Sequence, residues 1–255
     1  TGVSGSGKST LLRHLLLPAA QGAVQTRKRG QFYEYRGAKF YGLFDFDQVI
    51  AVDQGSFGQT ARSDVSTYAD IQPHLRTFFA SLPEAAKRGL QPRHFSHNHR
   101  QGMCKMCWGL GYKTVDLQFL PAVRLTCEAC HGFRLNPLAL EVRYKGKHLG
   151  ELLQLSVEGA LLTFSPLPKV AKRLQLLSEV GLSYLQLNQE LATLSGGEAQ
   201  RLRLSRELSK RGRGKVLYII DEPTVGLHPD DIAKLIPIFH RLADQRHTLL
   251  LIEHN

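Results

Sequence analysis

Two sets of residues in this chain have types and spacings that predict chemistry, and the first is a set of cysteines. They form two C-x2-C pairs with 19 residues between the pairs, Cys104 with Cys107 and Cys127 with Cys130. This spacing is typical of a structural zinc site, and four thiolate ligands leave no coordination position open for catalysis. We therefore predict a zinc module over residues 101–135. The alternative is four core cysteines without a metal, which the paired spacing disfavours.

The second set is a phosphate-binding loop, G-x4-G-K-S, at the start of the chain. Its glycines allow backbone N–H groups to surround phosphate oxygens, and the start of the following helix adds positive potential. We expect Lys8 to reach the β- and γ-phosphates of ATP and the Ser9 hydroxyl to bind Mg²⁺. The loop residues expected to bind ATP are Gly2, Ser4, Gly5, Ser6, Gly7, Lys8, Ser9 and Thr10.

An acidic pair after an apolar strand supports the nucleotide site. Residues 216–220 are apolar and lead directly to Asp221 and Glu222. Asp221 is placed to hold the magnesium shell, and Glu222 is placed to polarise the attacking water as a general base. Two acidic residues that merely end a strand are the simpler alternative, but the phosphate loop in the same chain favours hydrolysis of ATP with Mg²⁺.

The composition points to an anionic partner. The 255 residues include 33 Lys and Arg against 22 Asp and Glu, a formal net charge of +11. Such a balance favours a polyanion such as nucleic acid, although a solvated basic surface explains the charge equally well. The chain contains no apolar run of about 18 residues, the length that would predict a membrane span. No secretory signal is apparent. We expect a cytoplasmic protein with no membrane partner.

The periodicity of the chain predicts an α/β fold, because strand and helix patterns alternate at both ends around a parallel sheet. A hairpin is expected between the cysteine pairs, and a loop or edge over 21–37. Helices are predicted over 9–17 (ended by Pro18), 67–88, 149–164, 170–180, 198–211 and 230–244, and strands over 40–52, 138–144, 215–220 and 247–252.

The segment LSGGEAQR, residues 194–201, resembles the signature motif of the ATP-binding-cassette family. The resemblance implies that Ser195, Gly196 and Gly197 contact the nucleotide of an opposite domain, so ATP is sandwiched between two domains. It also implies that Gln54 is the Q-loop glutamine and His254 the switch histidine, both serving hydrolysis with Glu222.

The fold expected from this resemblance is an α/β, ATP-binding-cassette P-loop core with an inserted helical signature region and the four-cysteine zinc module. Residues 1–66 would form the first part of the core, with the P-loop and Q-loop. Residues 67–190 would form the inserted region. Residues 191–255 would form the signature helix and the second part of the core.

The chain resembles the UvrA family, the ATPase subunit of the bacterial UvrABC excision nuclease, over essentially its whole length. The motifs that carry the resemblance are TGVSGSGKSTL, LEVRYKGK, LATLSGGEAQRLRLSRELSKRG, LYIIDEPTVGLHPDD and LLIEHN. The match is to the second nucleotide-binding half of that family. It implies a homodimer that recognises damaged duplex DNA in nucleotide excision repair and loads the UvrB subunit, without being the nuclease itself. Because the chain starts inside the phosphate loop at Thr1, we expect a piece of a larger protein.

The chain departs from the family pattern at several places, two of which are extended segments. After Gln54 the family reads close to SPIGRTPRSNPATY, whereas this chain has GSFGQTARSDVSTY; before the second cysteine pair, FLPDVYVPC becomes FLPAVRLTC. Orthologue and divergent paralogue therefore both stay open. A transporter-type ATPase subunit and a non-catalytic zinc-binding paralogue are the alternative functions, and salt-dependent DNA binding would separate excision repair from both.

Overall fold

The computed structural model describes residues 6–26, 30–52, 62–117, 120–209 and 214–253. The chain divides into two compact units. We call the first the sheet unit (residues 1–56, 179–181 and 195–255) and the second the helical unit (57–178 and 182–194).

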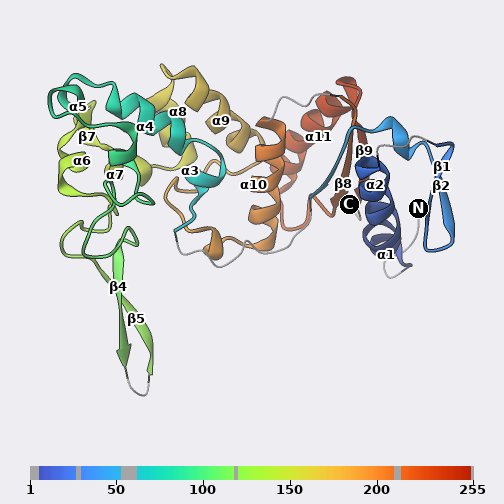
Figure 1. Ribbon diagram of the computed structural model, residues 1–255, viewed down its shortest axis with the longest axis horizontal. Coiled ribbons are helices and arrows are strands. Elements are labelled where there is room, and N and C mark those ends of the chain that lie inside the picture. The colour runs from blue at the N-terminus through green and yellow to red at the C-terminus, as the bar shows by residue number, and fades with distance from the viewer. Residues whose placement is uncertain (1–5, 27–29, 53–61, 118–119, 210–213, 254–255) are drawn as a thin grey trace. The chain divides into compact units, whose positions relative to one another are not determined.

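A parallel three-stranded sheet forms the centre of the sheet unit, in the order β3 (Gln48–Val52), β8 (Val216–Asp221) and β9 (Thr248–Ile252) (Figure 1). Every residue of the middle strand β8 is buried, as its apolar sequence predicts. Val52 pairs with Ile220, and Asp221 pairs with Ile252, so the three carboxyl ends meet at one edge. Ligands of parallel α/β sheets bind at this edge. The expected α/β fold is confirmed.

The helix after the phosphate loop is longer than the sequence predicts. It begins as α1 (Lys8–Leu11), widens into a π-helical segment (Leu12–Leu16) and continues as α2 (Leu17–Gln25). The predicted end at Pro18 is therefore wrong. Proline lacks an N–H and its ring clashes with the preceding turn of a regular helix, and a wider π turn before it relieves that conflict.

Helix α2 packs on the sheet through its small residues. Ala19, Ala20 and Ala23 are buried and share an apolar cluster with Leu217 and Ile219 of β8. Alanine side chains let the helix backbone lie close to the strands, which sets the helix after the phosphate loop firmly on the sheet.

The remaining elements of the sheet unit surround this centre. The predicted strand over 40–52 is divided, because Gly42 adopts a left-handed φ of 77° and turns the chain. The predicted loop or edge over 21–37 is partly helix α2 and partly strand β1. These elements are β1 (Phe32–Tyr35), β2 (Ala38–Tyr41), the 3-10 turn η2 (Leu43–Asp45), α10 (Gly196–Ser209) and α11 (Pro229–Asp244).

Short helices make up most of the helical unit, because prolines and capping residues interrupt the predicted long ones. Ser156, for example, accepts a hydrogen bond of 3.1 Å from the backbone of Gly159 and starts α8 within the predicted 149–164 helix. The helices are α3 (Val65–Tyr68), α4 (Gln72–Ala80), α5 (Pro83–Lys87), η3 (Pro92–Phe95), α6 (Pro137–Glu141), α7 (Leu149–Leu153), α8 (Val157–Phe164), α9 (Pro168–Glu179) and η4 (Leu191–Thr193).

The core of the helical unit consists of large apolar side chains that these helices turn inward. The rings of Phe79 and Phe95 lie 5.7 Å apart between centroids. The largest fully buried side chains in this unit are Phe79, Phe95, Phe164, Ile71, Leu75, Leu135, Leu149, Leu152, Leu174, Leu177, Leu182 and Leu185.

The strand predicted over 138–144 is mostly wrong, since the segment is largely helix α6. The Asn136 side chain accepts a hydrogen bond of 2.8 Å from the backbone of Ala139, and Pro137 occupies the first helical turn. An Asn cap followed by proline is a strong helix start, and it overrides the apolar pattern of LALEV.

Two antiparallel hairpins complete the helical unit. Strands β4 (Tyr112–Leu117) and β5 (Leu120–Thr126) join the two cysteine pairs, and this hairpin projects away from the helices of the unit (Figure 1). The predicted hairpin is confirmed. A small second hairpin pairs β6 (Arg143–Tyr144) with β7 (Lys147–His148). Within the described ranges, no helix combines the length and the apolar composition that crossing a bilayer requires.

Candidate functional site

The four cysteines come together as one buried cluster. All four Sγ atoms lie within 4.8 Å of one another. The Cys104 and Cys127 sulfurs are 3.9 Å apart, and the Cys107 and Cys130 sulfurs are 3.6 Å apart. Zinc–sulfur bonds of about 2.3 Å in a tetrahedron place sulfurs about 3.8 Å apart. The residues present therefore fit a structural zinc ion.

The backbone around the sulfurs takes conformations that bring N–H groups toward them. The Gly111 N–H donates a hydrogen bond of 3.2 Å to the Cys107 sulfur. Trp108 and Gly109 have φ angles of 53° and 80°, in the left-handed region. A Cβ on Gly109 would also collide with the backbone oxygen of His97, so this position requires glycine. Such contacts orient the ligands of a metal site.

Burial affects the thiols unequally. It raises the pKa of Cys107 and of Cys130, because an apolar surrounding disfavours thiolate. Burial also opposes ionisation of Cys127, but backbone N–H groups of Cys130 and Ala129 donate to its sulfur and lower its pKa overall. Ionising the whole set therefore needs a central cation, and a soft dication such as zinc supplies that charge.

A buried cluster of charged residues lies beside the cysteines, and we call it the Asp64–Arg134–Glu190 cluster. Arg134 contacts Asp64 at 3.4 Å through one guanidinium nitrogen and Glu190 at 3.5 Å through another. Asp64 is 0% exposed, and Arg134 is 9% exposed. Two carboxylates and one guanidinium thus share a site from which water is largely excluded.

Further contacts anchor Asp64. Its Oδ1 accepts hydrogen bonds of 2.8 Å from the Ser66 hydroxyl and from the Thr67 N–H, so it also caps helix α3. His97 Nε2 lies 3.6 Å from Asp64 and donates to the Arg62 carbonyl at 3.2 Å. Burial lowers the pKa of His97, and the nearby Asp64 opposes this only in part.

Three segments that are distant in sequence meet at this cluster. The Leu191 N–H donates to the Ser63 carbonyl at 3.0 Å, so the residues just before α3 run beside the stretch that leads to the signature motif. The Cys104 N–H donates to the Arg134 carbonyl at 2.9 Å, which ties the first cysteine pair to the same place. The sequence analysis missed this cluster, and its only signal was Asp64 in a helix-capping position before α3.

Arg124 of the hairpin is exposed, but its guanidinium contacts two other side chains. Its guanidinium lies 3.0 Å from Glu190 and 4.3 Å from the centre of the Tyr112 ring. These two contacts fix the base of the hairpin against the segment that contains Glu190.

The start of the helix that follows the predicted phosphate loop lies within the described part of the chain. Gly7 has a left-handed φ of 86° just before α1, and Lys8, Ser9 and Thr10 form the first turn. Ser6 precedes them in a bend. The predicted residues outside the described ranges are Gly2, Ser4, Gly5, Gln54 and His254.

Asp221 ends the buried strand β8 at the carboxyl edge of the sheet. Its Oδ2 lies 2.6 Å from the Arg13 guanidinium, and its backbone oxygen accepts a hydrogen bond of 2.6 Å from Gln200. Its Oδ1 is buried and has no hydrogen-bond partner among the described residues. A carboxylate oxygen of this kind fits a magnesium shell. Glu222 follows with φ 50°, and its N–H donates to Ile252 at 2.8 Å.

The signature motif forms a reciprocal cap at the start of α10. The Ser195 hydroxyl accepts from the Glu198 N–H at 3.3 Å, and the Glu198 carboxylate accepts from the Ser195 N–H at 2.7 Å. This capping box presents Gly196 and Gly197 in the first helical turn. A Cβ on Gly197 would lie 3.3 Å from the Val225 backbone oxygen, so the close approach there favours glycine.

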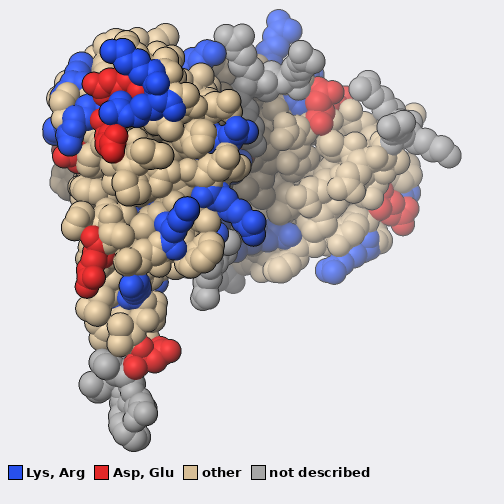
Figure 2. All heavy atoms as spheres, turned by 60° about the vertical axis from the view of Figure 1, so that its left-hand side comes forward, with Lys and Arg blue, Asp and Glu red and all other residues tan. Residues whose placement is uncertain are grey.

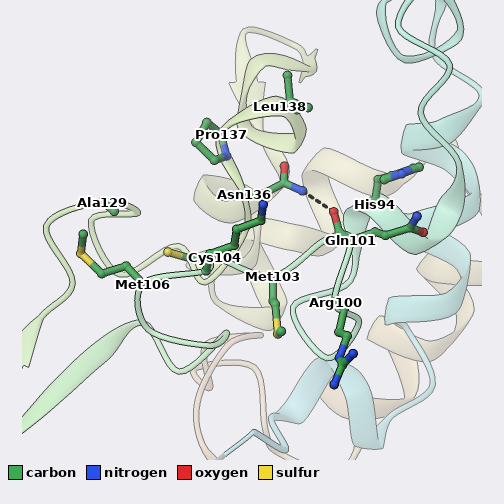
Figure 3. A pocket seen from close by; sticks show the side chains of 11 residues that line it. His94, Arg100, Gln101, Met103, Cys104, Met106, Ala129, Asn136, Pro137 and Leu138 are labelled. Atoms are coloured by element: carbon green, nitrogen blue, oxygen red, sulfur yellow. Dashed lines mark hydrogen bonds between the residues drawn. The ribbon is translucent and has the colours of Figure 1, made fainter.

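An open pocket of about 990 Å³ lies beside the first cysteine pair (Figure 3). The Asn136 amide donates to the Gln101 carbonyl at its edge. None of its lining residues is acidic, and Arg100 and Lys105 are basic. Its apolar lining includes Met103, Met106, Ala129, Pro137 and Leu138. Elsewhere on the surface, Figure 2 shows Lys and Arg side chains over the forward face, with acidic side chains between some of them.

Comparisons with known proteins agree with one another. The UvrABC system protein A of Pasteurella multocida is 49% identical to this chain over 255 residues, and that of Haemophilus influenzae is 48% identical. The chain is fully covered in both cases and spans 27% of each relative's length. The crystal structure of UvrA2 from Deinococcus radiodurans matches with a TM-score of 0.85 and 40% identity, over 100% of this chain and 30% of that one. No family model matches the chain.

The cysteine cluster predicts that the protein binds zinc in a fixed ratio. We expect about one zinc ion per chain by metal analysis, because four thiolates close one tetrahedral site. Cys104→Ser should lose that zinc, whereas Met106→Ser, between the first pair of cysteines, should keep it. Zinc retained in full by Cys104→Ser would contradict the assigned ligands.

The Asp64–Arg134–Glu190 cluster predicts a large stability difference between two arginines. Arg134→Met should lower the free energy of unfolding by about 3–5 kcal/mol, because it leaves buried carboxylates without their cation. Arg124→Met is the matched control and should cost much less, because Arg124 is solvent-exposed. Urea unfolding of both variants measures this, and equal losses would refute the buried role of Arg134.

Proposed function

The whole of this chain is related to the UvrA family, and from that relationship we propose that it is an ATP-hydrolysing, DNA-binding part of a nucleotide excision repair protein. The observation that carries the proposal is the 49% identity to a UvrABC system protein A over all 255 residues. The chain spans about a quarter of the length of such relatives. The activity and the partners of the whole protein are therefore part of what we propose.

We propose that the chain is the second nucleotide-binding half. Lys8 neutralises charge on the β- and γ-phosphates, and Ser9 with Asp221 holds magnesium. Magnesium held there would supply positive charge that offsets the negative charge of the phosphates. Glu222 takes a proton from the attacking water. The attack of this water on ATP releases phosphate and leaves ADP. Support comes from Asp221, whose buried Oδ1 has no hydrogen-bond partner within the described part of the chain, at the edge where the sheet ends.

Gln54 and His254 complete the hydrolytic set in this proposal. Ser195, Gly196 and Gly197 act on ATP bound by an opposite domain, so the site needs a second nucleotide-binding half. The capped start of α10 supports this role, because its first N–H groups and positive helix end suit phosphate oxygens. Assembly into a homodimer follows from the same requirement.

DNA is the proposed polyanion. The net charge of +11 favours it. The zinc module also exposes apolar side chains, including Met106 at 48%, Trp108 at 58% and Leu125 at 53%. Exposed apolar groups next to Lys and Arg suit bases and phosphates together, as where a lesion distorts a duplex. Loading of the UvrB subunit and a cytoplasmic location complete the proposal.

Binding of the complete protein to damaged and undamaged duplex, with and without ATP, tests the proposal. We expect tighter binding to damaged DNA and a steep fall of affinity with salt, because each neutralised phosphate releases counterions. The double variant Lys105→Ala with Lys113→Ala should flatten the salt slope, with Lys39→Ala as the control. A transporter-type ATPase or a non-catalytic paralogue would not discriminate between the two duplexes.

The nucleotide site predicts a variant that loses ATP hydrolysis but keeps its zinc. Lys8→Ala should abolish ATP hydrolysis in the complete protein, because the charge on the transferred phosphate is left uncompensated. Zinc content should stay unchanged, since the cysteines belong to the other unit. Phosphate release and metal analysis measure the two effects. Turnover equal to that of the Lys39→Ala control would contradict the assignment.

A further inference from the structure

Arg13 holds the carboxylate that the proposed function assigns to magnesium. Its Nη2 lies 2.6 Å from Asp221 Oδ2, the geometry of a strong charge-assisted hydrogen bond. The Asp221 side chain is 9% exposed and the Arg13 side chain is 44% exposed. The arginine therefore reaches inward from a partly solvated position and neutralises a buried acid.

The helix that carries Arg13 also carries the proposed phosphate and magnesium contacts. Ser9 and Arg13 are four residues apart on one continuous helix, so both project toward the same face. Arg13 lies in the π-helical segment Leu12–Leu16, and such segments are frequent at functional sites. The guanidinium is thus brought to the carboxylate from the helix turn that follows Ser9.

Asp221 carries one negative charge over two oxygens: Arg13 binds Oδ2, and the buried Oδ1 has no hydrogen-bond partner among the described residues. A buried carboxylate without a cation is strongly unfavourable, so Asp221 needs a positive partner whether or not nucleotide is bound. Magnesium held by Oδ1 would lie close to the guanidinium on Oδ2, and the two cations would repel each other across the single carboxylate. Arg13 and magnesium are therefore alternative partners of this carboxylate.

We propose that Arg13 competes with magnesium for Asp221, so that binding of Mg²⁺ with nucleotide displaces the guanidinium toward solvent. This inference rests on the proposed nucleotide site and deepens it. The competition has two consequences. The Arg13–Asp221 ion pair stabilises the protein without nucleotide, and the cost of breaking that pair sets how much magnesium the site requires.

The test is a magnesium titration of nucleotide binding in the complete protein, with a fluorescent, non-hydrolysable ATP analogue as the probe. Arg13→Gln should lower the half-saturating Mg²⁺ concentration about ten-fold, the size expected when a charge-assisted hydrogen bond no longer competes. Arg13→Lys keeps the charge and should fall between Arg13→Gln and the wild type. Arg36→Gln, on the β1–β2 turn, is the control and should match the wild type.

A second readout does not depend on nucleotide fluorescence. Arg13→Gln should lower the melting temperature of the protein without ligand but leave that of the Mg²⁺–analogue complex unchanged, because the ion pair is absent from the complex. Equal losses in both states, or an unchanged or higher magnesium requirement, would overturn the competition. A wild-type protein that binds no analogue would overturn the proposed nucleotide site itself, and with it this inference.

Discussion

The convergence of four cysteine sulfurs is the constraint on which the helical unit depends. The sulfurs lie within 4.8 Å of one another, although the two pairs are separated by the whole β4–β5 hairpin. Closing this distance fixes both ends of the hairpin. It also fixes Arg134, whose carbonyl accepts from Cys104 and whose guanidinium meets two buried carboxylates. The cysteine cluster and the buried charges are therefore parts of one connected structure.

Asp64 and Asp221 are both buried acids. Burying a carboxylate is costly in both places, but the two surroundings suit different roles. Asp64 has both side-chain oxygens engaged, Oδ1 by a helix N–H and a hydroxyl and Oδ2 by the Arg134 guanidinium. Such saturation is what a permanent structural group requires. Asp221 instead has one oxygen on Arg13 and one without a partner among the described residues. An incompletely satisfied carboxylate at a sheet edge is suited to exchange partners.

Much of the fold could be predicted from the sequence, and the failures have local causes. The strands ending at Val52, Asp221 and Ile252 follow from apolar runs, and the hairpin between the cysteine pairs follows from alternation. The helix end at Pro18 was wrong because a π turn accommodates the proline. The strand over 138–144 was wrong because the Asn136 cap overrides the apolar pattern. Periodicity describes faces, whereas caps and turns decide where elements begin and end.

The sequence by itself determined the chemistry that depends on short spacing. A C-x2-C pair and a phosphate loop each act within a few residues, so local chain geometry suffices to predict them. Only the tertiary structure decided which charges are buried and which partners they meet. Arg13 with Asp221, and Arg134 with Asp64 and Glu190, join residues far apart in the chain. Their pairing follows from desolvation, because a charge removed from water must find its partner wherever the fold brings one.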